Sequence, residues 1–230
     1  MKKKYYLFEM KTGALNIVSL VLFFGLLVLT GNLLQDQTID LGDLMAKSLL
    51  FMIPYFVFHE ILHSISYVLH GADFKNITYG AHLEKGVLCC LCKQNVSKRN
   101  ILTSLLYPFI FIGVITYIIG IVFNIPVLIL LSIMNISGCS GDLLMFYSLS
   151  RIKNFEYSEY DNPTAFGLFT EEDLSNKKLP GLKYVGTKNE LERKDLKKVT
   201  ISKTSIISFI IIELLGVLYL FIWKDLKRYI

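Results

Sequence analysis

The chain alternates between long apolar runs and short polar segments. No Lys, Arg, Asp or Glu occurs from Thr12 to Gln35, and none occurs from Ile101 to Gly141. About 20 apolar residues in a helix cross the hydrocarbon core of a bilayer, where only helices and closed barrels satisfy their backbone groups. The pattern predicts five membrane-spanning helices, at about Gly13–Leu34, Ser48–His70, Ile101–Phe123, Pro126–Leu149 and Thr204–Trp223.

The polar segments between these runs complete the expected architecture. Residues 72–98 contain two β-rich stretches, Phe74–Tyr79 and Val87–Cys92, and the turn-like stretch between them predicts a β-hairpin. Residues 150–203 are polar and predict a solvated segment. The expected fold is therefore an all-α integral membrane protein, a single polytopic domain over residues 1–230 with one small β-hairpin.

Basic residues set the expected orientation. Four lysines, from Lys2 to Lys11, precede the first span, whereas residues 36–46 contain three Asp and no Lys or Arg. Lys and Arg concentrate in the cytoplasmic loops of membrane proteins. We therefore expect a multi-pass protein of the cell membrane with its N-terminus, the hairpin and the 150–203 segment in the cytoplasm.

Composition narrows the possible classes. Hydrophobic residues make up 53% of the chain and charged residues 19%, with a mean hydropathy of +0.50, which excludes a disordered chain and a disulfide-stapled secreted module. The net charge of +5 reflects basic cytoplasmic segments, and no nucleic-acid-binding motif accompanies it. Cys89, Cys90 and Cys92 fit reduced packing in a strand, with metal binding or acylation near the membrane as alternatives.

The second span carries the sequence His59-Glu60-Ile61-Leu62-His63, an H-E-x-x-H motif. Residues four apart lie about 40° apart around a helix, so both imidazoles face one side and can share one zinc ion. Glu60 is then the candidate general base that takes a proton from water. The alternative is that these side chains only form hydrogen bonds to other helices, although three ionisable groups at this depth are costly and usually functional.

A catalytic zinc site needs a third protein ligand and an open position. The extended metalloprotease pattern is excluded, because Ser66 and Leu69 stand where it requires Gly and His. Asp142 is the strongest candidate: it is the first charged residue after Arg99, and it has the same expected depth in its span as His63. An Asp that only reaches the membrane interface is the alternative. The other candidates are His82, Glu84 and Glu213.

Asn135 lies seven residues before Asp142, nearly two helical turns, so we expect both on one side of the helix. Its amide is a candidate to donate a hydrogen bond to the developing oxyanion or to a bound peptide, with an interhelical hydrogen bond as the alternative. Gly138 and Gly141 are expected to let this helix approach the histidine-bearing helix closely. Glu213 either pairs with a neighbouring helix or lines the site.

These residues resemble the site-2-protease-like intramembrane zinc metalloproteases, and the chain looks closest to a bacterial zincin-peptidase family. The likeness covers roughly residues 45–170. It is carried by the H-E-x-x-H motif, the β-like loop after it, Pro108 early in the third span, and the stretch from Asn135 to Asp142. The site-2 signature has Pro where Gly138 stands, and its Asp-Gly pair begins one residue later than Asp142, so the chain departs from it there.

The resemblance implies Zn²⁺ bound by His59, His63 and Asp142, with Glu60 as the base. The predicted function is zinc-dependent hydrolysis of peptide bonds in a membrane protein or peptide, with the bilayer and that substrate as partners and no nucleic acid. One rival is a non-proteolytic membrane protein that keeps the zinc-site fold for binding or regulation. A transporter that uses these side chains as a polar path is the other rival, and the lack of an evident inverted repeat argues against it.

Overall fold

The structure is a computed structural model that describes residues 3–33, 40–82, 87–159 and 165–187. Two long helices begin the membrane part, α1 over Thr12–Leu33 and α2 over Leu41–Leu69. The predicted first span coincides with α1 to within one residue. Helix α2 begins seven residues before the predicted second span, because the Asp40 carboxylate caps it by accepting from the N–H groups of Gly42 and Asp43.

The third apolar run is continuous but changes its helical pitch. Helix α3 (Lys98–Pro108) passes into a six-residue π-helix, η3 (Phe109–Val114), which continues as α4 (Ile115–Val122). The fourth run is broken at Cys139 into α5 (Pro126–Gly138) and α6 (Ser140–Ser150), which are bent by 43°.

The described residues contain three helices long and apolar enough to cross a membrane, or four if α5 and α6 form one span. The chain is therefore a membrane protein by length and composition of its helices. The fifth predicted span, residues 204–223, lies outside the described residues, and so does Glu213.

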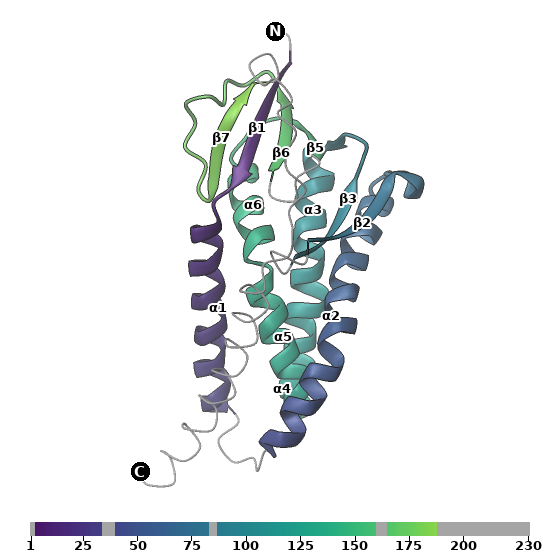
Figure 1. The fold of residues 1–230 in the computed structure, drawn as a ribbon, viewed down its shortest axis with the longest axis vertical. Coiled ribbons are helices and arrows are strands. Elements are labelled where there is room, and N and C mark those ends of the chain that lie inside the picture. The colour runs from purple at the N-terminus through teal and green to yellow at the C-terminus, as the bar shows by residue number, and fades with distance from the viewer. Residues whose placement is uncertain (1–2, 34–39, 83–86, 160–164, 188–230) are drawn as a thin grey trace.

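A five-stranded antiparallel sheet covers one end of the helices and corrects the all-α prediction (Figure 1). Its order is β4-β5-β6-β1-β7. The strands are β1 (Lys4–Met10), β4 (Val96–Ser97), β5 (Glu156–Glu159), β6 (Ala165–Thr170) and β7 (Leu182–Thr187). Charge alone does not indicate this sheet, because the charged N-terminal segment and the polar segment after residue 150 both contain short apolar stretches, and these pair with each other.

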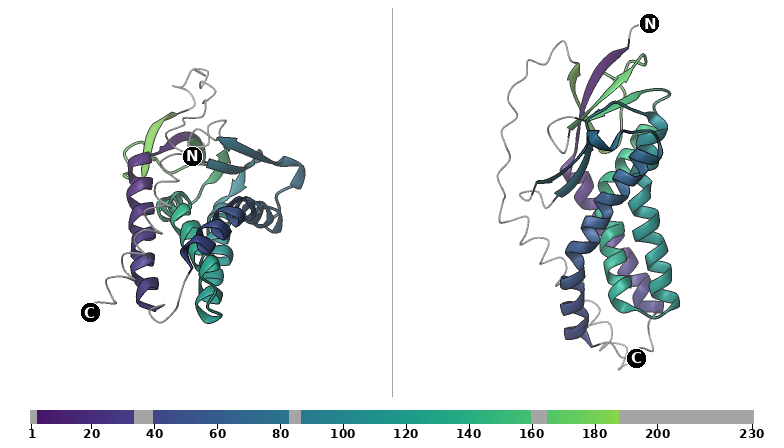
Figure 2. Two further views of the ribbon diagram at one scale, coloured as in Figure 1. Left: turned by 60° about the horizontal axis from the view of Figure 1, so that its bottom comes forward. Right: turned by 90° about the vertical axis from the view of Figure 1, so that its right-hand side faces the viewer.

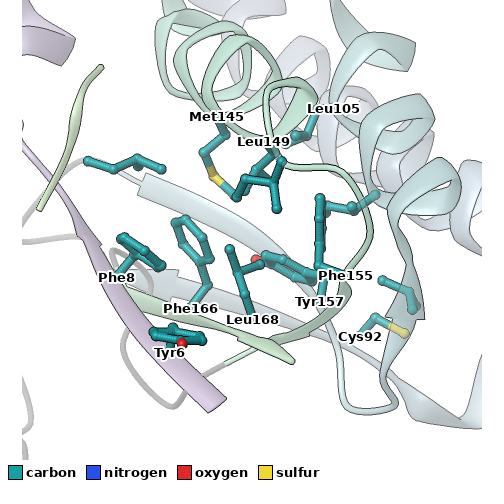
Figure 3. Packing of buried hydrophobic residues seen from close by; sticks show 14 of the residues in the cluster. Tyr6, Phe8, Cys92, Leu105, Met145, Leu149, Phe155, Tyr157, Phe166 and Leu168 are labelled. Atoms are coloured by element: carbon teal, nitrogen blue, oxygen red, sulfur yellow. The ribbon is translucent and has the colours of Figure 1, made fainter. Parts of the chain in front are cut away.

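The sheet packs its inner side onto the ends of α3 and α6. Tyr6 and Phe8 of β1 and Phe166 and Leu168 of β6 are almost fully buried, and they meet Leu149 of α6 in one cluster (Figure 3). Lys98 at the start of α3 donates from Nζ to the carbonyl of Ser150 (3.1 Å), the last residue of α6, and to that of Ile152 (2.5 Å), just beyond it. These contacts fix α6, and hence its first turn, relative to α3.

The predicted hairpin is present, formed by β2 (Ile77–His82) and β3 (Val87–Cys92). The strands are antiparallel, with Ile77 opposite Cys92 and Tyr79 opposite Cys90. The hairpin follows α2 and a short 3₁₀ turn (Phe74–Asn76), and it lies at the same end of the helices as the five-stranded sheet (Figures 1 and 2). The described strands therefore lie at one end of the helices (Figure 1).

Candidate metal centre

The two histidines of the motif face each other on α2. Their Nε2 atoms are 3.1 Å apart, and their rings stand at 68° with centroids 4.9 Å apart. The helical spacing of four residues produces this pairing, as predicted from the sequence. Both side chains are largely withdrawn from solvent, with 13% of the His59 and 11% of the His63 side chain exposed.

Asp142 reaches the same point from α6. Its Oδ2 atom is 3.4 Å from Nε2 of His59 and 3.5 Å from Nε2 of His63. The break at Cys139 places Asp142 in the first turn of α6, where the helix dipole favours a carboxylate. The structure therefore brings together the three residues that the sequence singled out as candidate ligands.

The other ring nitrogen of each histidine is held by a hydrogen bond. His63 Nδ1 lies 2.9 Å from the main-chain carbonyl oxygen of Ser104, which can only accept, so Nδ1 carries the proton. His59 Nδ1 lies 2.9 Å from Oδ1 of Asn135. The Asn135 amide is itself oriented, because its Nδ2 donates to the carbonyl of Pro108 at 3.2 Å. In the neutral imidazoles, both Nε2 atoms thus present lone pairs to the Asp142 carboxylate.

With both imidazoles neutral, three acceptor atoms face one another, and such an arrangement fits a cation. A tetrahedral zinc site with bonds of about 2.0–2.2 Å separates its ligand atoms by about 3.3–3.6 Å. The three edges here are 3.1, 3.4 and 3.5 Å. The donor set of two imidazoles and one carboxylate is one that zinc binds in catalytic sites, and it leaves a fourth position open.

Cys139 provides a second possible grouping. His59, Cys139 and Asp142 offer ligand atoms that all lie within 4.8 Å of one another, so they too could hold a metal ion. The Sγ atom lies 4.0 Å from Nδ1 of His59, the nitrogen that already binds Asn135, whereas His63 faces Nε2. The set with His63 is favoured because its shorter separations match zinc and leave the Asn135 bond intact. Sequence reasoning missed Cys139, whose only signal was its position three residues before Asp142.

Glu60 faces the hairpin beside the histidines. Its carboxylate lies beside the main-chain N–H of Cys90 in β3. A second tie joins the hairpin to α2, since the Tyr79 hydroxyl donates to Ser64 Oγ at 2.7 Å. The candidate base and the strand β3 are therefore fixed next to each other.

Asn135 is fully buried and uses its amide for the interhelical hydrogen bond that was the second of its two predicted roles. The oxyanion role stays a prediction. Gly138 has no atom within 4 Å of the place a Cβ would take, so it does not bring helices together. The close approaches occur at Gly113 and Gly120, where a Cβ would lie 2.9 and 2.7 Å from side chains of α5.

The remaining ligand candidates cannot be placed at the site. Glu84 and Glu213 lie outside the described residues, and for His82 the structure describes the strand alone. The described participants that the sequence did not suggest are Ser104 and Cys139. A main-chain carbonyl such as that of Ser104 leaves no mark in a pattern of side chains.

A comparison with models of known protein families gives one match. The model of a family described as "Putative zincin peptidase" matches residues 52–156, which include the motif of α2, the hairpin and Asp142. No curated protein and no solved structure matches the chain. The family match points to the metallopeptidase class, in which zinc is the implied cofactor.

Proposed function

We propose that this chain is a membrane-embedded zinc metallopeptidase that hydrolyses peptide bonds of a membrane-associated protein. One observation carries the proposal: Nε2 of His59, Nε2 of His63 and Oδ2 of Asp142 converge within 3.5 Å, while both Nδ1 atoms are engaged elsewhere. The match to zincin-type peptidases over residues 52–156 supports it.

Each residue then has a distinct task. His59, His63 and Asp142 would hold the zinc ion, which would supply Lewis-acid chemistry for the scissile carbonyl and for the attacking water. Asn135 and the Ser104 carbonyl keep the imidazoles in the tautomer that leaves Nε2 for the metal. Glu60 takes the proton from the attacking water and delivers it to the leaving amine.

The hairpin is suited to hold the substrate. A helical segment hides its carbonyls, so a substrate must be extended before hydrolysis. The contact between the Cys90 N–H and Glu60 turns one edge of β3 towards the base. An extended substrate segment that adds to this edge as a further strand would lie alongside Glu60.

The depth of the site indicates from which side it is reached. His63 is six residues from the end of α2, about 9 Å along the axis, and that end carries the hairpin and the sheet. Lys3 and Lys4, at the start of β1, also lie there, which supports a cytoplasmic position of this side in the cell membrane. We therefore infer cleavage near the cytoplasmic end of a membrane-inserted substrate.

Zinc measurements on single variants test the ligand set. We expect about one zinc per chain in the purified wild type and in His70→Ala, a histidine control on the same helix. His63→Ala and Asp142→Ala should lose the metal, whereas Cys139→Ala should keep it. Loss in Cys139→Ala together with retention in His63→Ala would assign the metal to the Cys139 grouping. A wild type without zinc would refute the metallopeptidase and favour a binding or regulatory protein.

Glu60→Gln tests the chemistry separately. This variant should bind zinc as the wild type does and should trap membrane proteins that the wild type cleaves. Cleavage of a trapped protein in proteoliposomes should fall by about 10²- to 10⁴-fold, the usual contribution of a general base. Glu171→Gln, an exposed carboxylate of the sheet side, is the matched control and should cleave normally. Undiminished cleavage by Glu60→Gln would refute the assigned role.

A further inference from the structure

Pro108 lies one helical turn after Ser104 and changes what the Ser104 carbonyl can bind. In an α-helix the carbonyl of residue i accepts from the N–H of residue i+4. For Ser104 that residue is Pro108, which has no N–H. The next N–H, that of Phe109, donates to the carbonyl of Leu106 instead. The helix thus leaves the Ser104 carbonyl for another donor.

His63 supplies that donor. Its Nδ1 lies 2.9 Å from the Ser104 carbonyl oxygen, and the Ser104 hydroxyl donates back to the His63 carbonyl at 3.3 Å. Ser104 is fully buried and His63 is 9% exposed, so no water competes freely for this carbonyl. The missing N–H at position 108 therefore leaves the Ser104 carbonyl available, and His63 Nδ1 binds it.

The same proline also contributes to the second histidine. Its own carbonyl accepts from Asn135 Nδ2 at 3.2 Å, and Asn135 Oδ1 accepts from His59 Nδ1. Beyond Pro108 the helix continues as η3, in which hydrogen bonds span five residues, as the bond from Ile115 N–H to the Ile110 carbonyl shows. Two carbonyls one turn apart, at positions 104 and 108, hence orient both imidazoles from the third helix.

We propose that Pro108 is a positioning residue for the metal centre, because its missing N–H reserves the Ser104 carbonyl for His63 and so directs Nε2 of His63 to the metal. The inference rests on the proposed zinc function. Groups that orient a ligating histidine in this way typically change metal affinity by about 10- to 100-fold. An N–H introduced at position 108 competes with His63 for the same oxygen.

The test compares two replacements that both remove the ring. Pro108→Ala restores the N–H, whereas the α-hydroxy acid analogue of alanine (lactic acid), incorporated at position 108, has no N–H. We expect Pro108→Ala to weaken zinc binding by about 10- to 100-fold and the analogue to retain near wild-type affinity. Pro54→Ala is the control, since Pro54 is an exposed proline inside α2. Equal affinities of the alanine and lactic acid variants would overturn the proposal.

Nitrogen NMR of ¹⁵N-histidine protein without metal gives a second measurement that needs neither zinc nor activity. Neutral His63 should be in the Nδ1–H tautomer in the wild type and in the lactic acid variant, and a mixture of tautomers in Pro108→Ala. An unchanged tautomer in Pro108→Ala would refute the role of Pro108. A wild type that shows the tautomer but binds no zinc would refute the proposed function alone.

A further variant covers the case in which Pro108→Ala does not fold. The α-hydroxy acid analogue of leucine at position 105 converts the Ser104 carbonyl into an ester, a weaker acceptor, and keeps the Leu105 side chain in the core. We expect the Nδ1–H tautomer of His63 to lose population in this variant. The same change at Leu102 removes a comparable helical N–H and should leave His63 as it is. Identical histidine spectra in both analogues would contradict the proposal.

Discussion

Replacing Asn135 by alanine removes a fully buried amide that joins two helices to the metal centre. Its Oδ1 accepts from His59 Nδ1 at 2.9 Å, and its Nδ2 donates to the Pro108 carbonyl at 3.2 Å and, over a longer distance of 3.7 Å, to Cys139 Sγ. Asn135→Ala leaves His59 Nδ1 and the Pro108 carbonyl without this partner. Water does not replace it easily, because Asn135 has 0% exposure. A buried polar group that loses its partner costs about 1–3 kcal/mol, so the two together cost about 2–6 kcal/mol.

Asn135→Ala should also lower the affinity for zinc, and this effect distinguishes a group that orients a metal ligand from one that only stabilises the fold. Without the Asn135 carbonyl, His59 is free to rotate and to change its tautomer, and loss of such a partner lowers metal affinity by about 10- to 100-fold. That factor corresponds to about 1.4–2.7 kcal/mol of binding free energy. Asn135→Asp keeps an acceptor for His59 Nδ1 and loses the Nδ2 donor that serves Pro108 and Cys139. We therefore expect its zinc affinity to stay above that of Asn135→Ala.

The assay is competition between the detergent-solubilised protein and a fluorescent zinc chelator, with thermal unfolding of the metal-free protein measured in parallel. Asn100→Ala is the matched control, since Asn100 is a buried asparagine of α3 whose Nδ2 faces the His70 carbonyl at 3.4 Å. It should lower the unfolding temperature without changing zinc affinity. Wild-type zinc affinity in Asn135→Ala would refute the view that this amide orients a metal ligand.

Three further predictions concern the packing around the site. Tyr55→Phe removes a hydroxyl that lies within 3.2 Å of three polar atoms of the neighbouring helices, and it should lower the free energy of unfolding by about 1–3 kcal/mol with unchanged zinc affinity. Gly120→Ala places a Cβ 2.7 Å from Ile129 Cγ1, so thermal unfolding should show a loss of about 1–3 kcal/mol; an unchanged stability would mean that α4 and α5 separate easily. Tyr79→Phe breaks the bond to Ser64 and should reduce cleavage but not zinc content, and equal cleavage would show that this tie does not position the hairpin.

The membrane helices could be predicted because their signal is local. An apolar run without charge is visible in the sequence, and the first predicted span agrees with α1 to within one residue. The start of α2 could not be predicted from hydropathy, because its first turn is polar and the Asp40 cap decides where it begins. The break at Cys139 was equally invisible, since apolar and small residues stand on both sides of it.

The sheet was missed because its pairings join distant segments. Strand β1 pairs with β6 and β7, which lie more than 150 residues later in the chain. The hydrophobic periodicity of one segment does not indicate which distant segment it pairs with. A local signal was nevertheless present: Tyr6, Leu7 and Phe8 are strongly apolar for a segment between lysines, and all three are buried. A cytoplasmic tail that is only solvated has no reason to contain such residues.

In the candidate site, the side chains could be predicted from the sequence, whereas the main-chain groups that orient them could not. His59, Glu60 and His63 follow from a motif, and Asp142 follows from its depth in a charge-free run, because each is a chemical group that lipid does not tolerate alone. The groups that orient these residues are the Ser104 and Pro108 carbonyls and the Cys90 N–H, which any residue type could offer. Their availability depends on helix geometry and on one proline. The proposed function therefore depends on two kinds of group. The ligand side chains can be recognised in the sequence, whereas the backbone groups become available only when α3 and the hairpin are folded.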